Sequence, residues 1–335
     1  MILDKILEHD LTKVAITGGA AVDPDGLACV EAMALIIREH NPDAHIDKFY
    51  NGKFDRPQNK TMRELLRLNQ RQVRSDDGEY TCVISVDGPA TTSAIQPVDF
   101  VIDHHPADVE PRVAMDVRAV GACSSIMWEY LVAAGIDIKE FPEVATALAI
   151  GISTDTAERI SETTSPLDLE AEAACCLAAD HKLYVGIKQY PKPHYYADFY
   201  VLGWQNKEIE GTCLVTNLGI IAPERSGVIS HLAEEFSAFI GVETCCVIAM
   251  VGDFFHASVR TSDTNLNAND FCKQMGVGGG RRGAGVFRVE LPDAFKGTND
   301  PAMFDAGYNI LMDKILKFTG DGARTTAKFK IVEEG

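Results

Sequence analysis

Basic residues are scarce in this chain. It has 31 lysines and arginines against 49 aspartates and glutamates, so its formal net charge is −18. Broad electrostatic binding to nucleic acid or to an anionic membrane requires a basic surface. The charge therefore argues against broad binding to nucleic acid or a membrane, and we expect neither long duplex nucleic acid nor a membrane as a partner. A bound metal ion or a few local arginines could still hold a small anion in one pocket.

The sequence also lacks the cysteine pattern of a zinc site. Its nine cysteines are odd in number, include no Cys-x-x-Cys pair and lie in apolar segments such as residues 81–84. Cysteines of this kind are typical of reduced, buried residues in an intracellular protein. The first residues do not resemble a signal peptide, and no run of about 18 apolar residues offers a membrane span. We therefore expect a cytoplasmic protein.

Apolar runs and helical spacing alternate along the chain, whose 335 residues are enough for about two domains. The pattern predicts helices over 1–10, 27–38, 60–71, 123–133, 144–152, 167–179, 227–238, 266–275 and 305–317. It predicts strands over 14–17, 44–49, 82–88, 98–102, 212–217, 244–251, 255–260, 286–291 and 323–332. Strands that alternate with helices are typical of α/β domains.

Acids and imidazoles follow several predicted strands at their carboxyl ends. Asp23-Pro24-Asp25-Gly26 follows the first strand, Asp87 ends the third, and Asp103-His104-His105 ends the fourth. A further acid, Asp155, lies among small residues. Each motif alone also fits a solvated turn. Together they predict a metal or phosphate site, because ligands of open α/β sheets bind at the carboxyl ends of the strands, and imidazole and carboxylate are common metal ligands.

A glycine-rich segment in the second half, residues 276–285, precedes the predicted strand 286–291 and carries Arg281 and Arg282. Runs of glycine let backbone N–H groups approach an anion, and arginine adds a charged fork for phosphate. Composition alone also fits a flexible surface loop. We expect a loop that binds phosphate, because the two arginines stand out in an acidic chain.

The ordered set of motifs resembles the DHH phosphoesterase superfamily. Its four motifs are similar, in order and approximate spacing, to Asp23-Pro24-Asp25-Gly26, Asp87, Asp103-His104-His105 and residues 151–156. Residues 258–261 and 278–285 look like its C-terminal DHH-associated domain, so that the resemblance spans about residues 13–292. The family includes RecJ-type exonucleases, nanoRNases, cyclic dinucleotide phosphodiesterases and relatives that hydrolyse polyphosphate or pyrophosphate. Those last usually carry a different C-terminal domain, so the resemblance points to nucleotide substrates.

The resemblance implies an α/β fold of two domains. The first would be a doubly wound, mostly parallel sheet, and the second a smaller α/β domain, with the active site in the cleft between them. The implied boundaries are residues 1–185 for the metal-binding catalytic domain, 186–207 for a connector and 208–335 for the substrate-binding domain. The resemblance also suggests a homodimer.

The resemblance further implies a hydrolase with two manganese or magnesium ions. One ion would be held by Asp25, Asp87, His104 and Asp155, and the other by Asp23 with Asp87. The catalytic residues would be Asp103, which orients His104, and His105, which contacts the substrate phosphate. The rest of the substrate would be bound by Arg260, Gly278, Gly279, Gly280, Arg281 and Arg282.

Two departures from the family pattern bear on function. The family places a histidine or an aspartate shortly before its first acids, where this chain has Ala20 and Ala21, so one metal site would be weak. Arg281 stands where the family has the histidine of a Gly-Gly-Gly-His loop, which would alter substrate preference. We expect an exonuclease-like phosphodiesterase or phosphatase that hydrolyses short oligonucleotides or small nucleotides with metal-activated water. The alternative is a catalytically impaired member that binds a nucleotide or a protein partner.

Overall fold

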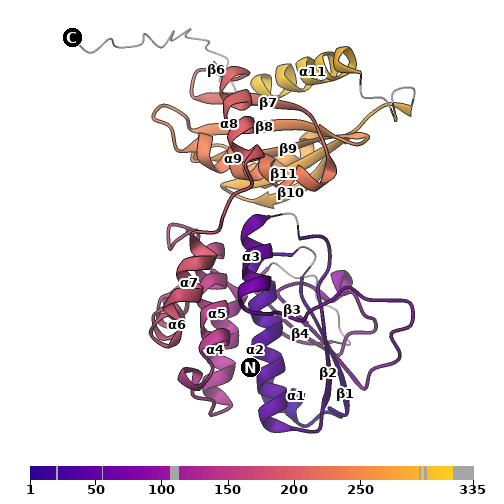
Figure 1. Cartoon of the computed structure of the whole chain (residues 1–335), viewed down its shortest axis with the longest axis vertical. Helices are drawn as coiled ribbons and strands as arrows, with labels where there is room; N and C mark the ends of the chain where they lie inside the picture. Colours follow the sequence, from indigo (N-terminus) through magenta and orange to yellow (C-terminus); the bar gives the residue numbers. More distant parts are fainter. Residues whose placement is uncertain (20–21, 55, 106–112, 294–295, 298–299, 320–335) are drawn as a thin grey trace, which may run out of the picture. The chain divides into compact units, whose positions relative to one another are not determined.

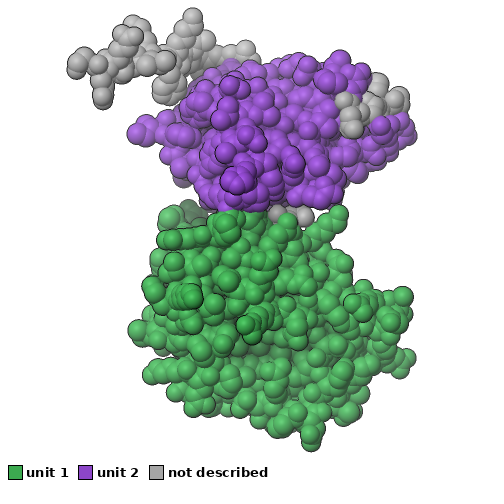
Figure 2. Space-filling model, in the orientation of Figure 1, with its two compact units in different colours: residues 1–191 green, residues 192–335 purple. Residues whose placement is uncertain are grey.

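The computed structural model describes residues 1–19, 22–54, 56–105, 113–293, 296–297 and 300–319. Ala20, Ala21 and the strand predicted over 323–332 lie outside these residues. The chain divides into two compact units, Met1–Pro191 and Lys192–Gly335 (Figures 1 and 2). None of the helices in the described ranges has the length and apolar character needed to cross a membrane.

The first unit is built on a parallel sheet. Its elements are α1 (Leu3–Leu7), β1 (Lys13–Thr17), α2 (Pro24–His40), β2 (His45–Phe49), α3 (Pro57–Leu65), β3 (Cys82–Val86), η1 (Ala90–Thr92), β4 (Phe100–Asp103), β5 (Ala114–Val117), α4 (Cys123–Ala133), η2 (Ile138–Glu140), α5 (Pro142–Asp155), α6 (Pro166–Ala178) and α7 (His181–Lys188). The described strands all run parallel, in the order β2-β1-β3-β4-β5. This is the order of a doubly wound sheet, in which the direction of winding reverses between β1 and β3. The predicted doubly wound, parallel sheet of the first domain is confirmed.

Alternate residues of each strand are buried on opposite faces of this sheet. Val14 and Ile16 of β1 pack into the core with α2, α4 and α5, whereas Ala15 packs on the other face with Phe49 and Val101. The helices α2, α4 and α5 contact one another and lie on one side of the strands in Figure 1. Because both faces are covered, the central strands β1, β3 and β4 are mostly apolar and buried, whereas the edge strands β2 and β5 are partly polar.

The second unit has a mixed sheet. Its elements are α8 (Tyr195–Gln205), β6 (Glu208–Glu210), β7 (Cys213–Ile221), η3 (Pro223–Arg225), α9 (Gly227–Ser237), β8 (Thr244–Val251), β9 (Phe254–Thr261), α10 (Ala268–Met275), β10 (Val277–Arg281), β11 (Ala284–Glu290) and α11 (Pro301–Thr319). The strand order is β10-β11-β9-β8-β7-β6, in which only β7 and β8 pair in parallel among the described strands. The α10 and α11 residues pack on one face, and the α8 and α9 residues pack on the other.

The glycine-rich segment is a strand and not the predicted loop. Val277–Arg281 forms β10, which pairs with β11 in a hairpin whose turn is Arg282-Gly283. A Cβ atom at Gly278 would overlap the carbonyl oxygen of Val286, and Gly280 meets the same restriction. The absence of side chains therefore allows the two backbones to approach closely, which composition alone could not distinguish from loop flexibility.

Candidate metal centre

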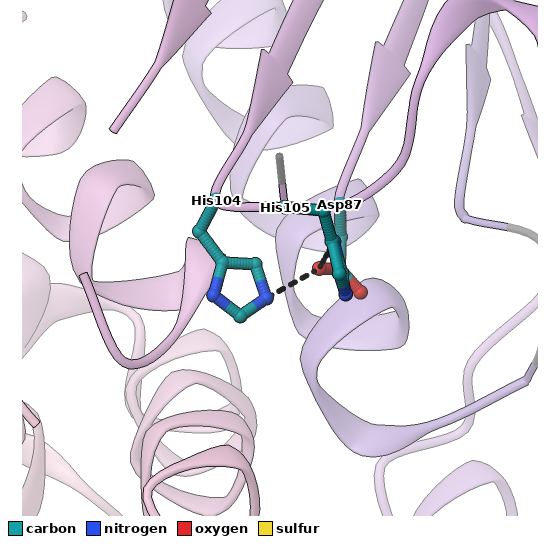
Figure 3. Close-up of side chains that lie close together, drawn as sticks. All are labelled: Asp87, His104 and His105. Carbon is teal, nitrogen blue, oxygen red and sulfur yellow. Dashed lines mark ion pairs between the residues drawn. The ribbon is translucent and has the colours of Figure 1, made fainter. Parts of the chain in front are cut away.

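Acids and imidazoles from four elements meet at the carboxyl edge of the first unit's sheet. Asp87 directly follows β3, and His104 with His105 directly follows β4. Asp25 lies in the first turn of α2, and Asp155 is the last residue of α5. Figure 3 shows the side chains of Asp87, His104 and His105 converging. Parallel strands end at the same edge, which is why residues far apart in the sequence meet here.

One imidazole nitrogen faces three carboxylates. The Nε2 atom of His104 lies 3.3 Å from Oδ1 of Asp87, 3.4 Å from Oδ2 of Asp155 and 3.8 Å from Oδ2 of Asp25. The His104 side chain is only 10% exposed, and Asp25 is fully buried. The structure thus brings together the four residues that were predicted to hold the first ion.

The donor atoms of this cluster fit a divalent metal ion. Among the residues that the structure describes, Oδ1 of Asp87 and Nε2 of His104 are buried and lie 3.3 Å apart as an ion pair, but neither makes a hydrogen bond of normal geometry. Incomplete hydrogen bonding of a buried polar atom is costly, and a coordinated cation would reduce that cost at both atoms. Two sets of side chains could hold an ion: Asp25, His104 and Asp155, and Asp87, His104 and His105. Carboxylates with an imidazole suit divalent ions.

The pKa values of the carboxyl groups are raised first by burial and then by the charges of their neighbours. Burial raises the pKa of Asp25, and the Asp155 charge raises it further. Burial likewise raises the pKa of Asp87 far above its usual range, with the charges of Asp25 and Asp23 adding to the effect. For His104, burial lowers the pKa, but the adjacent Asp155 and Asp87 carboxylates outweigh it and hold the pKa well above its ordinary value. Without a metal, the site therefore retains protons.

The carboxylates of the predicted second pair, Asp23 and Asp87, both lie close to Gly26. Asp23 caps α2 by accepting a hydrogen bond from the backbone N–H of Gly26 at 2.9 Å. A Cβ atom at Gly26 would lie 3.1 Å from Oδ2 of Asp87 and 3.3 Å from Oδ1 of Asp23, so glycine keeps the space between the two carboxylates open. Burial, followed by the Asp155 charge, raises the pKa of Asp23 to about 7.

Asp103, which was predicted to orient His104, contacts the imidazole of His105 and the backbone of His104. Its Oδ1 atom lies 2.8 Å from Nδ1 of His105 and accepts the backbone N–H groups of both histidines. Residues two apart on an extended chain point to the same side, whereas neighbours point to opposite sides. His104 is oriented by the carbonyl oxygen of Val120, 3.1 Å from its Nδ1 atom. A backbone carbonyl gives no signal in the sequence, so Val120 could not be predicted.

Backbone strain gathers around the same site. Four of the five non-glycine residues with positive φ in the described chain lie here: Asp87 at 57°, Ala157 at 49°, Glu158 at 58° and Arg159 at 69°. The left-handed region is unfavourable for residues other than glycine, and strained backbone is concentrated at functional sites. Hydrogen bonds hold the turn after Asp155, because the Glu158 N–H group donates to the carbonyl oxygen of Ser153 at 2.8 Å.

The predicted substrate residues of the second unit lie on β9, on β10 and in the turn after β10. Arg260 on β9 donates from Nε to Glu234 at 2.6 Å and from Nη1 to Ser258 at 3.0 Å. Arg282 donates to the carbonyl oxygen of Thr264 at 2.8 Å. The remaining members, Gly278, Gly279, Gly280 and Arg281, belong to β10. Their role in substrate binding stays a prediction.

A parallel sheet with acids and histidines at its carboxyl edge, followed by a mixed-sheet unit, defines a two-unit α/β protein with a candidate metal centre. No protein-family model matches the chain. An uncharacterised protein of Methanocaldococcus jannaschii is 28% identical over 327 residues, covering 96% of this chain and 67% of that protein.

Solved structures share the fold. The crystal structure of an exopolyphosphatase-related protein from Bacteroides fragilis matches with a TM-score of 0.65 at 12% identity, covering 94% of this chain and 97% of that one. The crystal structure of RecJ from Thermus thermophilus in complex with Mn²⁺ matches with a TM-score of 0.51 at 15% identity, covering 96% of this chain and 55% of that one. The chain therefore shares the fold of these two proteins.

Proposed function

We propose that this chain is a metal-dependent phosphoesterase, a phosphodiesterase or phosphatase that acts on short oligonucleotides or small nucleotides. The observation that carries the proposal is the single nitrogen of His104 facing three carboxylates in a mostly buried site. One imidazole cannot balance the charge of three closely spaced carboxylates, of which those of Asp25 and Asp87 are buried, so the cluster calls for further positive charge. The fold match to RecJ in complex with Mn²⁺ supports manganese as that charge, with magnesium as the alternative.

Each residue of the centre has a role in this proposal. Asp25, Asp87, His104 and Asp155 would hold one ion, and Asp23 with Asp87 would hold a second. A divalent ion in such a centre lowers the pKa of water and offsets the negative charge of a phosphate group. His105, whose side chain is 53% exposed and whose Nδ1 faces Asp103, would present its Nε2 atom to a phosphate oxygen.

The net charge of −18 supports small substrates. Long nucleic acids are held by many phosphate contacts with basic residues, which an acidic surface does not supply. A short oligonucleotide or a nucleotide needs only a few contacts in one pocket. We propose that Arg260, Arg281 and Arg282 of the second unit supply some of these contacts.

Replacing Arg281 by alanine is expected to raise KM about tenfold, since one charge-assisted hydrogen bond to phosphate contributes about 1.5 kcal/mol. The Kd for Mn²⁺ should stay unchanged, because the proposed ligands all belong to the first unit. Steady-state kinetics and calorimetric titration would measure the two quantities. Arg288→Ala is the matched control, because Arg288 pairs with Val277 at the far end of the same hairpin. An unchanged KM in Arg281→Ala would remove β10 from the substrate site.

The proposed function is tested by metal binding and turnover together. The purified chain would be stripped of metal, titrated with Mn²⁺ by calorimetry, and assayed on a dinucleotide, adenosine bisphosphate, a cyclic dinucleotide and pyrophosphate. Mn²⁺ binding with turnover of a nucleotide substrate is the expected result. Mn²⁺ binding without turnover of any substrate would favour the catalytically impaired alternative, and absence of Mn²⁺ binding would overturn the metal centre.

A further inference from the structure

A buried carboxylate outside the proposed ligands, Asp168 of α6, holds the segment that leads into α4. Its side chain is fully buried. It accepts hydrogen bonds from the backbone N–H groups of Gly121 at 2.8 Å, Ala122 at 3.1 Å and Ser165 at 2.7 Å. The hydroxyls of Ser125 and Ser165 add bonds of 2.6 and 2.7 Å. These five donors compensate for burying the carboxylate. The hydrogen bonds in turn fix the backbone at Gly121, Ala122 and Ser165.

The helix that Asp168 holds is the one that binds Asp25. Ala122 is the N-cap residue of α4 and has no polar side chain with which to cap the helix. The next two N–H groups both bind Asp25: Cys123 donates to Oδ2 at 2.7 Å and Ser124 donates to Oδ1 at 2.8 Å. The first turn of a helix favours negative charge, and here two buried carboxylates share it. The orientation of Asp25 therefore depends on where Asp168 places α4.

Gly121 connects the same network to Asp155. A Cβ atom at Gly121 would lie 2.9 Å from Oδ2 of Asp168 and 2.7 Å from Cγ2 of Thr156. Thr156 directly follows Asp155, and its hydroxyl donates to the carbonyl oxygen of Ile152 at 2.7 Å. The segment before α4 is therefore packed tightly between Asp168 and the end of the helix that carries Asp155. Displacing this segment would disturb two of the proposed ligands.

We propose that Asp168 is a positioning residue of the metal centre, which sets the first turn of α4 and thereby the orientation of the Asp25 carboxylate. This inference rests on the proposed function, because it requires Asp25 to hold a metal ion. It deepens that function because part of the metal affinity would depend on Asp168, which is not a proposed ligand. The Asp168 carboxylate instead accepts hydrogen bonds from the protein.

The test is the Mn²⁺ affinity of Asp168→Asn in the full chain. Asparagine keeps the shape of the side chain but removes its charge and places an NH₂ group where one oxygen accepts N–H donors. The Kd for Mn²⁺ is expected to rise about tenfold, as for other residues that orient a metal ligand. Calorimetry would be performed well below the melting temperature, where circular dichroism shows wild type and variant fully folded. Under that condition a loss of global stability alone would leave the Kd unchanged.

Two further variants keep the test decisive. Asp180→Asn is the matched control, since Asp180 caps α7 through the N–H groups of Lys182 and Leu183, and its Kd for Mn²⁺ should equal that of the wild type. If Asp168→Asn does not fold, Ser125→Ala removes one donor to Asp168 and should raise the Kd about threefold.

The outcomes separate the two proposals. A wild-type chain that binds Mn²⁺, with a folded Asp168→Asn or Ser125→Ala variant of equal affinity, would overturn the positioning role and leave the proposed function intact. A rise in Kd of the same size in Asp180→Asn would also overturn it, because the effect would then not act through α4. If the wild-type chain binds no Mn²⁺, the proposed function and this inference both fail.

Discussion

Replacing Asp87 by asparagine is expected to lower metal-dependent hydrolysis by about 1000-fold, equivalent to about 4 kcal/mol of transition-state stabilisation. Asp87 is the proposed ligand shared by both ions, and its Oδ1 atom lies 3.3 Å from Nε2 of His104. Asparagine is the better choice over alanine because Asp87 has a φ of 57°, which asparagine tolerates more readily. Initial rates at saturating Mn²⁺ would measure the loss.

The same substitution should not destabilise the metal-free protein, although it lowers activity. Burial and the charges of Asp25 and Asp23 raise the pKa of Asp87, which shows that its ionised form is unfavourable in the metal-free site. Removing this carboxylate should leave the metal-free protein as stable as the wild type or more stable. Mn²⁺ should raise the melting temperature of the wild type and have little effect on the variant. Scanning calorimetry with and without Mn²⁺ would measure both quantities.

Asp99→Asn is the matched control for Asp87→Asn. Asp99 precedes β4 and accepts a hydrogen bond from the backbone N–H of Val83 at 2.8 Å, at the amino edge of the same sheet. We expect Asp99→Asn to keep the wild-type rate, because that edge is remote from the proposed centre. Turnover by Asp87→Asn at the wild-type rate would contradict the assignment of the centre.

The contribution of Asp23 to the stability of the metal-free protein is expected to fall as the pH rises from 3.8 to about 7. The pKa of Asp23 is raised by burial and by the Asp155 charge, so the folded state binds a proton that the unfolded state releases in this window. When the pKa of an acid is higher in the folded state, the acid stabilises that state at pH values below its pKa in the unfolded state. This stabilisation is lost as the pH rises to its pKa in the folded state. The full change would be about 4 kcal/mol, and solvent screening of the half-buried side chain reduces it to about 2 kcal/mol.

Urea unfolding of the chelated protein at several pH values would measure this loss. Asp23→Asn removes the titrating group, so its free energy of unfolding should fall less steeply over the same range. Saturating Mn²⁺ should also flatten the wild-type curve, since metal ions and protons compete for the carboxylates. A slope in Asp23→Asn equal to that of the wild type would show that other groups determine the pH dependence.

Much of the fold could be predicted from local sequence patterns. The helix predicted over 123–133 and the strand predicted over 244–251 have the predicted bounds in the structure. Long apolar runs and helical periodicity decide such elements locally. The short edge strands β5 and β6 were not predicted, because three or four half-polar residues carry no such pattern and pair only where a neighbouring strand is already present.

The sequence by itself also predicted which acids would come together. Asp87 and His104 follow two parallel strands and therefore meet at one edge of the sheet. Asp25 at the start of α2 and Asp155 at the end of α5 also lie within 4 Å of His104, as the motifs predicted. Only the tertiary structure decided how these side chains are oriented. The Val120 carbonyl that faces His104 and the Asp168 carboxylate that holds α4 come from distant segments. Such contacts depend on how buried polar groups find partners after packing, and local sequence pattern does not encode them.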